Sequence, residues 1–227
     1  VVRDRILKKY PLPVSVSIIE AEIRGEVVGQ DPADVPRFEA IARDIFKMPN
    51  IEAASHSYSH PFFWINDDPT GDKYDSQYLP LKTDYPNIDY KREIDDSVSF
   101  INEHLSHAGN PVQVMLWSGN CRPPPEALAR VRKLGIVNVN GGDTLISRRQ
   151  PTVTAVAPRT MPWGDELQIF APNQNENVYT NDWEGPLFGT FIHVIDTFKL
   201  TESPRRLKPV NLYYHFCCGD FQASLNS

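Results

Sequence analysis

Two hydrophobic patterns alternate along the chain. Short runs of apolar, often β-branched residues, typical of buried strands, are separated by longer segments in which apolar residues recur every three or four positions, typical of amphipathic helices. This alternation predicts βαβ units around a largely parallel sheet, and therefore an α/β fold. The predicted strands are Val14–Ile19, Ile51–Ser55, Val112–Trp117, Ile136–Val139, Leu167–Phe170 and Val210–Phe216.

Four segments carry the helical spacing. Their apolar positions are Phe38, Ile41 and Ile45; Ile94, Val98, Ile101 and Leu105; Leu128, Val131 and Leu134; and Phe188, Phe191, Ile192, Ile195 and Phe198. Pro123–Pro125 before the third helix and Gly135 after it are ordinary start and stop signals. Asn66–Asn87 and Thr144–Asn181 are rich in Pro, Asp, Asn and Tyr and are predicted to be long loops.

Length and charge narrow the class of protein. The 227 residues favour one domain, 1–227, with a sizeable core. Because 23 Lys and Arg face 29 Asp and Glu, the formal charge is −6, and no basic run is present, so nucleic acid is not an expected partner. The apolar runs are too short for a membrane span. Twenty prolines indicate long, stiff loops.

The most informative local pattern is a pair of histidines that follows a predicted strand. His56 and His60 are four residues apart in Ser55–Pro61. If a helical turn begins there, both imidazoles lie on one face and can bind one divalent ion. No Glu follows His56, so this is not the zinc-protease pattern. The alternative is coincidence or helix capping, and Pro61 disfavours a helical His60.

Three further candidates also follow predicted strands. Arg122 lies in the proline-rich segment Ser118–Pro125, Asp143 follows a glycine pair, and His215 ends an aromatic strand. Each has a plain structural interpretation: a stiff corner with a surface arginine, a simple turn, or a core histidine. Together with the histidine pair, however, they sit at the carboxyl ends of successive strands, where an α/β barrel has its active site.

These same residues resemble the motifs of the NodB-homology polysaccharide deacetylases, carbohydrate esterase family four. The stretch His56–Pro61 resembles the family's metal-binding motif His-Ser/Thr-x-x-His, and Arg122–Pro124 resembles its Arg-Pro-Pro motif. Asp143 resembles the acidic motif that follows, and Leu212–His215 resembles the final Leu-x-His motif, shifted by one residue. Within the family, the chain is most similar to the deacetylase domains of bifunctional Pel exopolysaccharide hydrolase/deacetylases.

The resemblance implies a distorted (β/α)7-type barrel and metal-dependent de-N-acetylation of an N-acetylhexosamine-containing exopolysaccharide. His56 and His60 would hold zinc, nickel or cobalt, and His215 would protonate the departing amine. Arg122 would orient the catalytic base, and Asp143 would fix Arg122. The resemblance also implies a periplasmic or otherwise extracytoplasmic location and contacts with other export-machinery proteins.

Two departures from the family pattern matter. The family's first motif, an Asp pair that supplies a metal ligand and the base, should precede the first helix, but Val1 already lies in a helix-like segment. We therefore expect the chain to be a fragment that lacks the first barrel strand, and we do not expect the loop pair Asp67-Asp68 to replace the motif. Pro125 stands where the family has an aromatic residue whose N–H helps to stabilise the oxyanion, and proline has no N–H.

Aromatic residues of the long loops are candidates for sugar contacts. Trp163, Tyr179 and Trp183 could stack on sugar rings, or could anchor the loop to the barrel. Two rival functions remain open at this point. One is a barrel that binds polysaccharide without cleaving it, since the base and one oxyanion donor are missing. The other is an unrelated metal-dependent hydrolase that acts on small amides.

Overall fold

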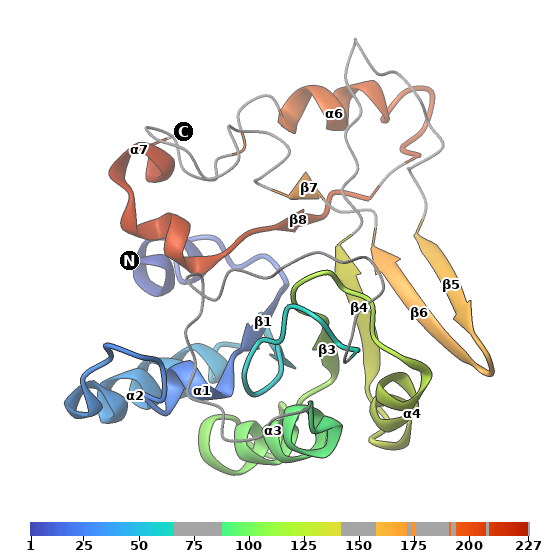
Figure 1. The fold of residues 1–227 in the computed structure, drawn as a ribbon. Coiled ribbons are helices and arrows are strands. Elements are labelled where there is room, and N and C mark those ends of the chain that lie inside the picture. Colours follow the sequence, from blue (N-terminus) through green and yellow to red (C-terminus); the bar gives the residue numbers. More distant parts are fainter. Residues whose placement is uncertain are drawn as a thin grey trace. The chain divides into compact units, whose positions relative to one another are not determined.

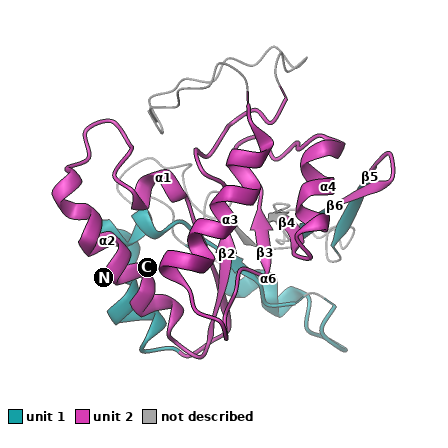
Figure 2. Ribbon diagram, turned by 90° about the horizontal axis from the view of Figure 1, so that it is seen from below, with its two compact units in different colours: residues 1–10, 141–161, 169–227 teal, residues 11–140, 162–168 magenta. Residues whose placement is uncertain are grey.

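The computed structural model describes residues 1–65, 88–141, 158–171, 174–175, 191, 194–207 and 209–226. These residues form two compact units (Figure 2). Unit 1 comprises residues 1–10, 141–161 and 169–227, and unit 2 comprises residues 11–140 and 162–168. Asp143, Tyr179 and Trp183 lie outside the described residues.

A parallel sheet is the framework of unit 2. Strands β1 (Val14–Ile18), β2 (Ile51–Ser55), β3 (Val114–Leu116) and β4 (Val137–Gly141) lie side by side in that order (Figure 1). The three pairings are all parallel. The predicted α/β class is therefore confirmed, with four parallel strands. Because these strands run in one direction, the residues that follow β2 and β3 emerge at the same edge of the sheet.

The helices of unit 2 follow the predicted amphipathic segments. They are α1 (Glu20–Ile23), η2 (Pro32–Asp34), α2 (Val35–Phe46), α4 (Pro125–Lys133) and a continuous helical segment formed by η4 (Lys91–Asp96), α3 (Ser97–Phe100) and η5 (Ile101–Leu105). Both flanks of this segment are π-helical. Its η4 end contacts α4 and its η5 end contacts α2. Ile41 and Leu134, predicted to face the core, are each 37% exposed.

One hydrophobic cluster in the core of unit 2 is built around two tryptophans. Trp64 and Trp117 meet edge to face with their ring centroids 4.8 Å apart, and both are almost fully buried. Residues of η4, β3 and α4 complete this cluster: Ile94, Met115, Ala127, Leu128 and Val131. Such edge-to-face packing of large aromatic rings fixes both partners in orientation. The segment that follows β2 is thus anchored to the segment that follows β3.

Unit 1 is built from short elements. These are η1 (Arg3–Leu7), β7 (Gln174–Asn175), α6 (Val194–Leu200), β8 (Leu212–Tyr213), η6 (Phe216–Asp220) and α7 (Gln222–Leu225). β7 pairs with β8 in parallel. The last predicted strand is therefore wrong in length: β8 spans two residues instead of Val210–Phe216, and a 3₁₀ helix begins directly after His215.

A strand was also missed by the sequence pattern. β5 (Arg159–Trp163) and β6 (Glu166–Ala171) extend the sheet beyond β4 in the order β4-β6-β5, where β5 falls in a predicted loop. The two strands are joined by a short turn at Gly164, whose φ of 62° is open to glycine but strained for other residues. Within the described residues, no helix is both long enough and apolar enough to cross a bilayer.

Candidate functional site

The two candidate metal ligands lie on a loop that leaves the carboxyl end of β2. The loop is not helical, because Ser57 and His60 have φ values of 71° and 55°, in the left-handed region. The conditional expectation of a helical turn is therefore wrong. The two imidazoles are nevertheless neighbours: the ring centroids of His56 and His60 are 4.8 Å apart, with the ring planes at 69°. The loop reaches this arrangement through left-handed backbone instead.

The orientation of His56 is fixed by one hydrogen bond. Its Nδ1 lies 2.8 Å from the carbonyl oxygen of Leu116, the last residue of β3, and its side chain is buried. Because a carbonyl oxygen can only accept, Nδ1 carries the proton and donates. In the neutral ring the lone pair is then on Nε2, and a backbone carbonyl behind the other nitrogen is the usual support for a metal-binding histidine.

A divalent ion of the zinc, nickel or cobalt type fits this chemistry. Two neighbouring imidazoles, one of them with its tautomer set, are suitable nitrogen donors for such ions. Within the part of the chain that the structure describes, no third His, Cys, Asp or Glu joins the pair to complete a three-ligand group. His56 and His60 therefore form a partial ligand set, since catalytic zinc sites use three protein ligands.

Serine side chains brace the loop from within. The Ser55 hydroxyl accepts the backbone N–H of Ser57 at 3.2 Å, and the Ser57 hydroxyl accepts the N–H of His60 at 3.0 Å. Ser55 and Ser57 are buried, and His60 is partly exposed. These bonds satisfy backbone donors that the irregular conformation would leave unpaired.

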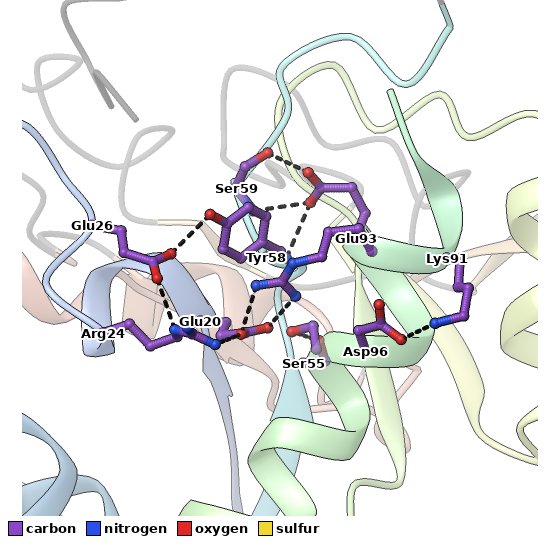
Figure 3. Close-up of polar contacts among 11 residues, drawn as sticks. Glu20, Arg24, Glu26, Ser55, Tyr58, Ser59, Lys91, Glu93 and Asp96 are labelled. Atoms are coloured by element: carbon purple, nitrogen blue, oxygen red, sulfur yellow. Dashed lines mark hydrogen bonds and ion pairs between the residues drawn. The ribbon is translucent and has the colours of Figure 1, made fainter. Parts of the chain in front are cut away.

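Glu93, a residue of η4, contacts the histidine loop through its side chain (Figure 3). Its side chain is fully buried, and its Oε2 accepts hydrogen bonds from the backbone N–H groups of Tyr58 at 3.1 Å and Ser59 at 2.9 Å. The Tyr58 N–H is shared with the main-chain carbonyl of Glu93, at 3.2 Å. The Ser59 hydroxyl donates to Oε1 of the same carboxylate. From another direction, the N–H groups of Glu20 and Ala21 donate to the carbonyls of Ser57 and Tyr58 at 3.1 and 3.0 Å. The backbone of the loop is thus hydrogen-bonded both through its N–H groups, to Glu93, and through its carbonyl groups, to residues 20–21.

A charged cluster lies against the same loop. Both Nη atoms of Arg92 donate to the buried carboxylate of Glu20 at 2.8 Å, and the guanidinium lies 3.5 Å from the centre of the Tyr58 ring. Arg24 binds both Glu20 and Glu26. Burial opposes the charge on Arg92, but the hydrogen bonds to Glu20 outweigh it and raise the pKa of the guanidinium. Arg92 therefore stays charged at any ordinary pH.

Tyr58 is the one ionisable residue of the His56–His60 loop besides the histidines. Its hydroxyl donates to Glu26 at 2.8 Å. Burial, and then the hydrogen bond to Glu26, raise the pKa of Tyr58 to about 12. The phenol is therefore neutral at neutral pH and acts as a hydrogen-bond donor.

The loop that carries Arg122 is bonded directly to the histidine loop. The Ser118 hydroxyl donates to the Pro61 carbonyl at 2.7 Å, and the N–H of Asn120 donates to the Phe62 carbonyl at 2.9 Å. In the opposite direction, the indole of Trp64 donates to the Ser118 carbonyl at 3.2 Å. The two sequence motifs are therefore brought together at one edge of the sheet, as predicted from their positions after neighbouring strands.

Arg122 itself is partly buried. Its backbone N–H donates to Oδ1 of Asn120 at 3.2 Å, and Cys121 before it has a left-handed φ of 55°. Its predicted partner Asp143 is outside the described residues, so that ion pair stays a prediction. Pro125 is the first residue of α4, where the missing N–H costs the helix nothing.

His215 and Trp163 are the other two site candidates within the described residues. His215 belongs to unit 1, where its Nε2 lies 3.3 Å from the hydroxyl of Tyr213. Its predicted role is not tested. Trp163 lies in β5 and not in a loop; it packs against the core cluster of unit 2 and donates to Gln168 at 3.2 Å. These contacts are those of the anchoring alternative, although the ring remains partly exposed.

Sequence reasoning missed the residues that support the loop. Glu93, Arg92 and Glu20 are not among the predicted site residues. The only local signal is an acidic side chain next to Ile94, at the buried start of an amphipathic helix, and a buried carboxylate requires a compensating partner. That signal indicates an interaction but does not identify the loop as the partner.

Comparisons with known proteins add to the fold only. No protein-family model and no curated protein matches the chain. Among solved structures, the chain is similar to the crystal structure of a 4-alpha-glucanotransferase from Thermococcus litoralis, with a TM-score of 0.53 and 15% sequence identity. The match covers 92% of this chain and 28% of the other, so the chain corresponds to less than a third of that protein's length. At this identity, the likeness supports the α/β fold and carries nothing about activity.

Proposed function

We propose that this chain is a metal-dependent deacetylase domain that removes acetyl groups from an N-acetylhexosamine-containing exopolysaccharide. The observation that carries the proposal is the contact between His56 and His60 at the carboxyl end of β2, with Nδ1 of His56 committed to a backbone carbonyl. The four motifs that resemble the NodB-homology deacetylases supply the reaction. A (β/α)7-type barrel is part of the proposal, supported by the parallel sheet and by the structural likeness.

Each candidate site residue would have its own role in this reaction. His56 and His60 would hold the ion, which supplies Lewis-acid polarisation of the acetyl carbonyl and a more acidic bound water. Arg122, paired with Asp143, would orient the carboxylate that serves these deacetylases as the base and accepts the water's proton. No residue of this chain is assigned that role. His215 would hold the proton that the departing amine takes up. Trp163, Tyr179 and Trp183 would contact sugar rings, and the substrate would be met outside the cytoplasm.

A polysaccharide-binding barrel without catalysis is the second candidate. Two observations favour it: Pro125 has no N–H for an oxyanion, and the described residues supply only two neighbouring metal ligands. Loss of one oxyanion donor can reduce the rate by about 10²–10³-fold. Such a protein would bind polymer and metal but release no acetate.

Acetate release distinguishes the two functions. The protein would be incubated with N-acetylated glucosamine and galactosamine oligosaccharides and with Zn²⁺, Ni²⁺ or Co²⁺. We expect metal-dependent release of acetate, abolished by His56→Ala and His60→Ala and unchanged by His107→Ala, which alters an exposed histidine remote from the loop in sequence. Binding of oligosaccharide without acetate release would favour the second candidate and overturn the first.

A further inference from the structure

We propose that Glu93 is a positioning residue for the histidine pair: its carboxylate holds residues 58–59 so that His60 lies beside His56. The inference rests on the proposed function only in taking this pair as the metal ligands. The contacts themselves are independent of that assignment.

The loop needs such a support because its backbone is strained. Ser57 and His60 are not glycines, yet both have left-handed φ values. Residues with a Cβ adopt this region only where surrounding contacts impose it, and they concentrate at functional sites. The left-handed positions lie on either side of Tyr58 and Ser59, the two residues that Glu93 contacts.

The chemistry of Glu93 matches the loop. Two backbone N–H groups and one hydroxyl converge on a carboxylate, a group that only accepts and has two oxygens available. Glu93 is fully buried, and a buried carboxylate is tolerated only when its oxygens are hydrogen-bonded. The neighbouring guanidinium of Arg92 binds Glu20, whereas the loop donors bind the carboxylate of Glu93, as Figure 3 shows.

Movement of this support would change the ligand geometry. His56 is fixed separately, through the Leu116 carbonyl, whereas the backbone path from His56 to His60 runs through the two residues that Glu93 holds. Loss of the carboxylate would therefore move His60 relative to His56. Supporting residues of this kind typically change metal affinity by about 10–100-fold when substituted.

The test compares Glu93→Gln with wild type and with Glu103→Gln, an exposed glutamate on the same helical segment. Gln keeps the shape of the side chain but replaces one accepting oxygen by a donor. Co²⁺ titration of the 227-residue protein would give the affinity and the visible absorption spectrum of the bound ion, and hydrogen exchange would report on the amides of Tyr58 and Ser59. We expect Glu93→Gln to weaken Co²⁺ binding by about 10–100-fold, to alter the spectrum and to speed exchange chiefly at the Ser59 amide, because the Tyr58 amide keeps its bond to the main-chain carbonyl of residue 93. Glu103→Gln should change none of these.

The outcomes separate this inference from the proposed function. Wild-type affinity, spectrum and amide exchange in Glu93→Gln would overturn the positioning role alone. If His56→Ala and His60→Ala bind Co²⁺ as tightly as wild type, the metal assignment fails, and unchanged amide exchange in Glu93→Gln would still overturn the role of Glu93. Should Glu93→Gln not fold, Ser59→Ala removes one of the three donors, and a several-fold loss of Co²⁺ affinity is expected; no loss would overturn the proposal.

Discussion

Gly119 lies so close to the backbone of Phe62 that a Cβ on Gly119 would come within 2.3 Å of the Phe62 carbonyl oxygen. The φ of Gly119 is 59°, so its backbone conformation also favours glycine. This is the point where the loop that carries Arg122 meets the loop that carries the histidines. The close approach allows the flanking hydrogen bonds from Ser118 and Asn120 to form.

Gly119→Ala is therefore expected to destabilise the protein by more than about 2 kcal/mol, because it adds a backbone clash to the cost of a left-handed alanine. Gly135→Ala is the matched control: its φ is 73°, but nothing lies within 4 Å of the added Cβ. It should cost only about 1 kcal/mol. Urea unfolding of both variants measures the difference, and equal costs would contradict the close contact.

Arg92 and Arg24 both bind Glu20, but they should differ in their contribution to stability. Arg92 makes two hydrogen bonds to a carboxylate that is 1% exposed, whereas the Arg24 side chain is 42% exposed. Arg92→Ala would leave Glu20 buried without its main partner, and a loss of about 3–5 kcal/mol in unfolding free energy is expected. Arg24→Ala should cost about 1 kcal/mol or less. Similar losses in the two variants, measured by urea unfolding, would refute the distinction.

The raised pKa of Tyr58 predicts a stability change at alkaline pH. The folded state keeps the phenol protonated to about pH 12, while an unfolded tyrosine ionises near 10. This contribution is complete below pH 10 and is lost as the pH rises through about 12, since the unfolded state then binds fewer protons. The difference in phenolate absorbance between wild type and Tyr58→Phe should titrate near pH 12. A midpoint near 10 would contradict both the burial of the Tyr58 phenol and its hydrogen bond to Glu26.

The tautomer of His56 can be observed directly. Because Nδ1 donates to the Leu116 carbonyl, nitrogen NMR of the neutral ring should show a protonated Nδ1 and an unprotonated Nε2. Added Zn²⁺ should then shift the Nε2 resonance most. A neutral ring protonated at Nε2 would contradict both the hydrogen bond and the proposed coordination.

The predictable part of the fold is the part with the strongest periodicity. β1 and β2 were predicted almost to the residue. β2 lies between β1 and β3 and is mostly buried, as expected of an interior parallel strand, whereas β1, at the end of the described strand order, alternates apolar and serine residues. β5 has no such signal: it contains Pro162 and carries exposed positions. β8 is two residues long, too short for any pattern to mark its ends.

The candidate site likewise has a part that the sequence predicts and a part that it does not. The spacing of His56 and His60 predicted that they could be neighbours only through a helical turn, which is not formed. The left-handed residues that bring the two rings together were not predicted, because serine and histidine carry no local signal for that conformation. Glu93 could not be assigned from sequence at all. Its partners are 34 and 35 residues away, and only the packing of the helical segment against the sheet brings them together.

The dispersed origin of the histidine loop's contacts has a kinetic consequence. The loop is held by backbone groups of residues 20–21, by Glu93 and, through His56, by Leu116. No single βα unit therefore contains all the residues that hold the loop. Closing such long chain segments is slow relative to forming local helices. We therefore expect the imidazole pair to assemble late, after β1, β2, β3 and the segment 91–105 have docked, so that partly folded chains have no matched pair of nitrogens to capture an ion.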